Sequence, residues 1–181
     1  YDGLYYQARD YLTSLQSSYT QRQDPVDNSS FALKVALELA KVNHCLGKHK
    51  DSEKTLDYCW GLLKEIDDVQ KDICMSVQGE VALTHGMLNH ERKLYQEALD
   101  HLNKALESFK GLEDKQYLNI VKCLRRIGQV YSEQKQYNKA MNYFQKALDT
   151  MEEKEPKDAF PKHVEVDRNY CQYGLLHMTS Q

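Results

Sequence analysis

The stretch of sequence that decides the fold is residues 124–147, which read LRRIGQVYSEQKQYNKAMNYFQKA. Its large and small apolar anchors recur at helical spacing and are, in order, Leu124, Ile127, Gly128, Tyr131, Tyr137, Ala140, Phe144 and Ala147. Two antiparallel helices pack closely only where one offers a notch and the other a bulky side chain. We therefore predict a helical hairpin in which Gly128 and Ala140 let the backbones approach, while Tyr131 and Phe144 fill the space beside them.

The same pattern recurs at earlier places in the chain. The copy 42 residues earlier consists of Ala82, Gly86, Asn89, Tyr95, Ala98, Leu102 and Ala105. A weaker copy, 46 residues before that, consists of Ala36, Leu39, Ala40, Asn43, Ser52, Leu56 and Cys59. Half-copies stand at the two ends, with Tyr5, Ala8, Leu12 and Leu15 at one and Tyr170, Tyr173 and Gly174 at the other. The chain is therefore predicted to be an array of hairpins, each covering the apolar surface that its neighbour exposes.

These anchors resemble those of the tetratricopeptide repeat. The resemblance implies an all-α fold, a right-handed superhelix of antiparallel helix pairs with about three full repeats and a half-repeat at each end. The copies are 42 to 46 residues apart, against about 34 in the standard repeat. Each helix is therefore expected to be about one turn longer than usual, and this spacing is similar to that of the kinesin light chain type.

The predicted organisation is one array over residues 1–181, as a fragment of a larger protein. It comprises a trailing helix at 1–22, repeats at 31–69, 70–112 and 116–154, and the first helix of a truncated repeat at 162–181. The predicted helices span 3–20, 31–46, 51–67, 70–89, 94–110, 116–134, 137–153 and 162–178. The breaks between them are predicted at residues 24–30, at Gly47 and Gly111, and between Pro156 and Pro161.

The composition agrees with long helices and excludes several classes of protein. Only 8 Gly and 3 Pro occur in 181 residues, too few for the many tight turns of an all-β fold. The chain is 41% hydrophobic, yet no apolar run approaches the roughly 18 residues of a membrane span. Its 24 basic and 27 acidic residues give a net charge of -3, so no overall positive field attracts nucleic acid or an anionic membrane.

The cysteines indicate a reducing compartment. The five are Cys45, Cys59, Cys74, Cys123 and Cys171, and they lie at least 14 residues apart. This spacing fits neither a zinc site nor a disulfide framework. We expect most of them to be small buried hydrophobes in a cytoplasmic protein.

No motif of an enzyme, a cofactor site or a metal site is present. Phosphate-binding glycine loops, G-x-S-x-G and H-E-x-x-H do not occur. The pairs His44/His49 and His85/His90 are each five residues apart, which on a continuous helix separates the two rings by roughly 140°. We therefore predict no catalytic residue, no cofactor and no histidine metal site.

The tetratricopeptide resemblance implies that the first helix of each hairpin lines a ligand groove. The positions expected to face it give the candidate residues Lys122, Arg125, Arg126, Gln129, Arg168, Lys34, Lys41, His44, Glu80 and His90. The same positions also select Leu37, Glu38, Cys45, Leu83, Thr84, Met87, Glu91, Ser132, Glu133, Cys171, Gln172, Leu175, Met178 and Thr179. Lys122, Arg125 and Arg126 share one helix face and could bind carboxylates. We predict a protein–protein interaction module that binds a peptide or helix of a partner, with acidic character, as a scaffold or regulatory arm.

Three alternatives to this prediction differ in how well they fit the sequence. A carboxylate clamp for chaperone tails is disfavoured, because only two of its five positions match, those occupied by Lys122 and Arg126. RNA binding by a helical repeat is disfavoured by the net charge of -3 and by the glutamates at groove positions. Self-association, with homodimers formed through open solenoid ends, stays open as a third interpretation.

Overall fold

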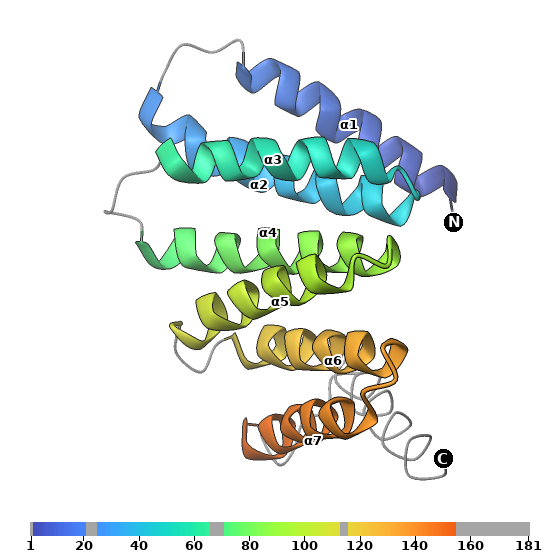
Figure 1. The fold of residues 1–181 in the computed structure, drawn as a ribbon. Helices are drawn as coiled ribbons and strands as arrows, with labels where there is room; N and C mark the ends of the chain where they lie inside the picture. The colour runs from blue at the N-terminus through green and yellow to red at the C-terminus, as the bar shows by residue number, and fades with distance from the viewer. Residues whose placement is uncertain (1, 21–24, 66–70, 113–115, 155–181) are drawn as a thin grey trace.

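The computed structural model describes residues 2–20, 25–65, 71–112 and 116–154, and these form seven helices and their connections (Figure 1). The helices are α1 (Asp2–Thr20), α2 (Pro25–Cys45), α3 (His49–Glu65), α4 (Lys71–Glu91), α5 (Tyr95–Lys110), α6 (Tyr117–Glu133) and α7 (Tyr137–Lys154). None of them is long and apolar enough to cross a membrane. The predicted all-α class is confirmed.

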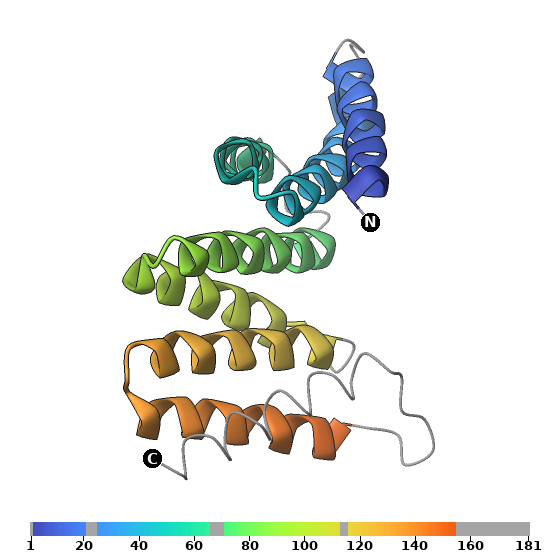
Figure 2. The same cartoon turned by 90° about the vertical axis from the view of Figure 1, so that its right-hand side faces the viewer.

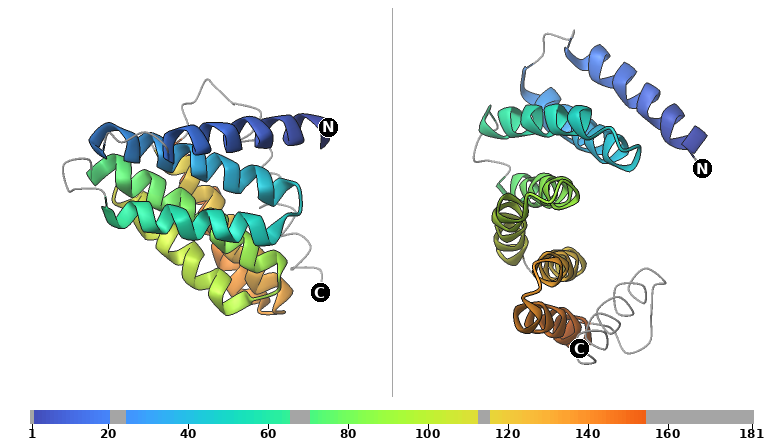
Figure 3. Two further views of the ribbon diagram at one scale, coloured as in Figure 1. Left: turned by 90° about the horizontal axis from the view of Figure 1, so that it is seen from above. Right: turned by 45° about the vertical axis from the view of Figure 1, so that its right-hand side comes forward.

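The helices pack pairwise in sequence order, as predicted for a solenoid. The pairs α2/α3, α4/α5 and α6/α7 form hairpins, and α1 packs against α2. Figure 2 shows the two hairpins from α4 to α7 as successive layers, and Figure 3 shows the helices of successive hairpins turned relative to one another. The first helices also contact each other, α2 with α4 and α4 with α6. They therefore share one surface.

Each of these first helices ends in a left-handed turn at an equivalent position. The turn residues are Gly47, Lys93 and Lys135, with φ of 68°, 61° and 59°. The residue after each turn donates its N–H back to a carbonyl five residues earlier, at 2.9 Å in all three cases. This bond satisfies a carbonyl that the helix end leaves unpaired, and it directs the chain into the second helix.

The two helices of a hairpin contact closely at the glycines predicted from the sequence, Gly128 and Gly86. A Cβ added at Gly128 would lie 2.8 Å from Cε1 of Phe144, and one added at Gly86 would lie 2.7 Å from Cγ of Leu102. Both distances are far below ordinary van der Waals contact. The predicted close contact of Gly128 with Phe144 is therefore confirmed.

The core follows the same anchors and forms two clusters. The larger one joins α4 to α7, and its fully buried members include Ala98, Leu102, Phe109, Ile127 and Met151. The smaller one joins α2, α3 and α4, and Trp60 packs against both. Because the two clusters span neighbouring hairpins and Trp60 packs against both, the hairpins stack instead of folding separately.

The start of α2 differs from the sequence prediction. The predicted break at 24–30 is wrong, because α2 already begins at Pro25. Proline suits the first helical position, where its missing N–H has no helical partner to lose, and polar residues are common in a first turn. The predicted helix at 162–178 and the residues Pro156 and Pro161 lie outside the described residues.

Candidate functional site

A pocket of about 400 Å³ opens between the three first helices α2, α4 and α6. Its lining residues are Lys41, His44, Cys45, Glu80, Leu83, Thr84, Met87, Asn119, Lys122, Arg125 and Arg126. Six of the predicted site residues are thus brought together: Lys41, His44, Glu80, Lys122, Arg125 and Arg126. They converge because helices that contact side by side present their i, i+3 and i+4 positions to the same space.

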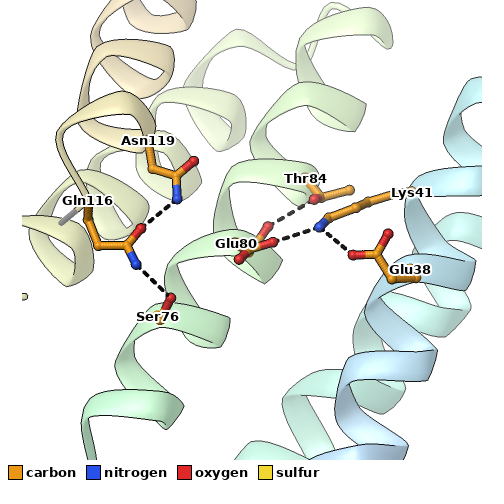
Figure 4. A network of polar contacts seen from close by, with 7 residues as sticks. All are labelled: Glu38, Lys41, Ser76, Glu80, Thr84, Gln116 and Asn119. Atoms are coloured by element: carbon orange, nitrogen blue, oxygen red, sulfur yellow. Dashed lines mark hydrogen bonds and ion pairs between the residues drawn. The ribbon is translucent and has the colours of Figure 1, made fainter. Parts of the chain in front are cut away.

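Lys41 and Glu80 form the central ion pair of the pocket. The Nζ atom of Lys41 lies 2.6 Å from Oε2 of Glu80 and 2.8 Å from Oε1 of Glu38 (Figure 4). Burial alone would lower the pKa of Lys41, but its bonds to the two carboxylates outweigh burial and raise the pKa. These bonds favour the charged form of Lys41, and the two carboxylates already compensate its charge.

A second polar network anchors the start of α6 to α4. Gln116 donates from Nε2 to Oγ of Ser76 at 3.3 Å, and Asn119 donates from Nδ2 to Oε1 of Gln116 at 2.7 Å (Figure 4). Asn119 also lines the pocket, and the sequence analysis missed it. Its position three residues before Lys122, on the same helix face, is the signal that could have found it.

The pocket carries an excess of positive charge on the α6 side. Its described lining holds four cations, Lys41, Lys122, Arg125 and Arg126, but only one carboxylate, Glu80. That carboxylate already binds Lys41. In the described part of the chain no hydrogen bond or ion pair joins Lys122 to a carboxylate. An anionic group in this pocket would therefore meet the ammonium group of Lys122, whereas Arg125 and Arg126 already take part in interactions of their own.

The other four predicted site residues do not line the pocket. Lys34 is exposed on α2, and Gln129 accepts a hydrogen bond of 3.4 Å from Nη1 of Arg126 just outside the lining. His90 is buried and faces Glu133, with Nε2 at 3.0 Å from Oε1. Arg168 lies outside the described residues.

His44 and His49 are close together, which the sequence analysis did not expect. The predicted separation assumed one continuous helix, whereas α2 ends at Cys45 and α3 begins at His49. The turn at Gly47 brings the ring centroids to 6.2 Å, and both rings approach the carboxylate of Glu91. The angular argument against a histidine pair is therefore wrong here.

The four described cysteines are all free thiols. Cys59 and Cys123 are fully buried, and burial raises the pKa of each thiol to about 12. They are small core residues, as expected, and unreactive near neutral pH. Cys45 differs because it is exposed at the pocket, while Cys171 lies outside the described residues.

Comparisons with known proteins agree with this fold. Residues 78–153 match the family model described as tetratricopeptide repeat. Among solved structures, the chain is similar to the crystal structure of BtubC (BKLC) from P. vanneervenii, with a TM-score of 0.71 and 11% sequence identity. That match covers 98% of this chain and 73% of the other, and at this identity it shows the fold alone. No curated protein matches the chain in sequence. The family match assigns residues 78–153 to the tetratricopeptide repeat family, and the helical hairpins of the other described residues follow the same pattern.

Proposed function

We propose that this chain binds a peptide or helix of a partner protein in the pocket between α2, α4 and α6, and that it favours partners with acidic or carboxylate groups. Tetratricopeptide repeat domains are in general protein–protein interaction modules. In this role the chain serves as a scaffold or regulatory arm of a larger protein.

The observation that carries the proposal is the charge of the pocket. Four cations and one carboxylate line it, and the carboxylate is held by Lys41 at 2.6 Å. Lys122, Arg125 and Arg126 supply ammonium and guanidinium donors from a single helix. Such donors form short, charge-assisted hydrogen bonds with carboxylates, and guanidinium groups can do so through two parallel bonds.

The apolar part of the lining supports a peptide ligand more than a small anion. Leu83 and Met87 lie between the charged helices and offer contact area for an aliphatic or aromatic side chain. A methionine adapts its shape to different partners because it is unbranched and has a polarizable sulfur. A segment that combines acidic and apolar residues would use both parts of the pocket.

The test uses synthetic peptides of one apolar sequence in matched acidic, neutral and basic versions, with binding measured by fluorescence anisotropy. We expect the acidic version to bind tightest. The double variant Lys122→Ala/Arg126→Ala should weaken its binding by about 2–5 kcal/mol if both cations form desolvated pairs with the peptide.

The matched control is Lys54→Ala/Lys110→Ala, which removes the same charge from exposed positions on α3 and α5, outside the pocket. Equal loss of affinity in both double variants would show that only the overall charge matters and would contradict the proposal. Tight binding of single-stranded RNA, with none of the acidic peptide, would favour the RNA-binding alternative instead.

A further inference from the structure

We propose that His44, His49 and Glu91 form a binding site for a zinc ion beside the pocket. The three residues come from the end of α2, the start of α3 and the end of α4. The site shares His44 with the pocket lining but includes none of the cations of α6.

The ligand atoms are already close together. One ligand atom from each residue can be chosen so that all three lie within 4.8 Å of one another. Nε2 of His44 lies 3.2 Å from Oε1 of Glu91, and Nδ1 of His49 lies 3.7 Å from Oε2 of the same carboxylate. Ligands at about 2.0–2.1 Å around a tetrahedral zinc ion are about 3.3 Å apart. Small side-chain rotations would therefore complete the geometry.

The backbone explains why these atoms meet. The left-handed turn at Gly47, with φ of 68°, reverses the chain so that His44 and His49 face each other across the hairpin end. Glu91 is the last residue of α4, which packs against both helices. Two imidazoles and one carboxylate are a ligand set used by zinc sites that keep a fourth position for water.

Both histidines are available to a metal ion. Nδ1 of each ring is buried without a hydrogen-bond partner, so at His49 the nitrogen nearest to Glu91 is not engaged. The ring of His44 is about nine-tenths buried, and imidazole nitrogens are common zinc ligands.

The next repeat provides an internal comparison. There His90 faces Glu133 at 3.0 Å, which repeats the contact of His44 with Glu91. The place of His49 is taken by Tyr95, whose hydroxyl lies 3.3 Å from Glu133. The contact of one histidine with one glutamate is thus a recurrent way of joining hairpins. The second histidine distinguishes the proposed metal site.

The experiment measures zinc binding by calorimetry to tag-free protein that a chelator has cleared of metal. Cobalt serves as a second probe, since its visible spectrum reports the coordination number. We expect one ion per chain in the wild type and at least about tenfold weaker binding in His49→Gln and in Glu91→Gln. Glu133→Gln is the matched control and should bind as the wild type does, because it removes the equivalent carboxylate from the repeat that carries Tyr95.

Three results would overturn the proposal. The first is a wild type that binds zinc no more tightly than Glu91→Gln, which would leave His44 and Glu91 as an ordinary polar contact. The second is an equal loss in Glu133→Gln. The third is zinc binding that disappears in Cys45→Ser and persists in Glu91→Gln, which would assign the ion to the exposed thiol. Circular dichroism of the metal-free variants checks that each one is folded. If His49→Gln is unstable, Glu91→Gln still allows the comparison, because the side chain of Glu91 is half-exposed.

Discussion

Replacing Gly86 by alanine should destabilise the chain although alanine is the better helix former. Gly86 lies inside α4 at its contact with α5. A Cβ there would lie 2.7 Å from Cγ of Leu102 and 3.2 Å from the carbonyl oxygen of Ala98. Leu102 is completely buried, and Cγ is its branch point, so the contact can be relieved only by moving the side chain or the helix. Overpacking of this kind costs about 1–3 kcal/mol.

Gly61→Ala is the matched control. Gly61 is an exposed residue inside α3, and a Cβ there meets no atom within 4 Å. Both substitutions gain the same helix propensity, about 1 kcal/mol. The difference in free energy of unfolding between the two variants therefore isolates the overpacking at Gly86, about 1–3 kcal/mol in favour of Gly61→Ala. In a domain of this size that corresponds to melting temperatures roughly 2–12 °C apart.

The assay is thermal and urea unfolding followed by circular dichroism and by the fluorescence of Trp60, which contacts both core clusters. Two probes are needed because repeat arrays can unfold in more than one step. A Gly86→Ala variant as stable as Gly61→Ala would refute the idea that Gly86 is a contact notch. It would also remove the repeat register from which the groove positions were derived.

Three further outcomes are expected. Lys135→Gly should raise the free energy of unfolding by about 0.5–1 kcal/mol in urea titrations, because Lys135 is exposed and its φ of 59° suits glycine. Burial, with the charges of His85 and Lys104, lowers the pKa of His101 to about 4. In the unfolded state the histidine pKa is about 6.5, so between these two values the unfolded state binds more protons than the folded state. The free energy of unfolding, measured across pH, should therefore fall as the pH is lowered from about 6.5 to 4. The fall should be smaller in His101→Gln. Tyr95→His should add a second zinc ion per chain in calorimetry; a single ion would contradict the equivalence of the two repeats.

The hairpins could be predicted because their determinants are local. A glycine and a large residue at fixed spacing specify one close contact, and the sequence between Leu124 and Ala147 contains the whole unit. The tetratricopeptide resemblance also implied that first-helix residues face one groove, and six of the ten site candidates line the pocket. Whether that pocket holds a ligand stays a prediction.

The ends of the helices were harder to predict than the hairpins, and an error at a helix end had a larger consequence for the candidate sites. Polar residues and a proline at 24–30 suggested a break, yet they are equally compatible with the first turns of α2. At the other end of α2, the exact residue at which the helix ends decides whether His44 and His49 lie on one continuous helix or on the two sides of a turn. Spacing arguments for metal ligands hold only inside one element, and the turn at Gly47 lies between these two histidines.

Ion pairs between neighbouring repeats depend on which residues occupy equivalent positions, and the overall composition does not reveal this. Lys41 bonds to Glu80, and the positions equivalent to this pair in the next repeat are Met87 and Lys122. The ion pair between α2 and α4 is thus replaced by a methionine and a lysine between α4 and α6, both lining the pocket. Because an apolar residue stands where the first pair has a charged one, the described contacts of Lys122 include no ion pair like that of Lys41 with Glu80. An acidic partner of the kind that we propose would supply the half of the contact that this repeat leaves out.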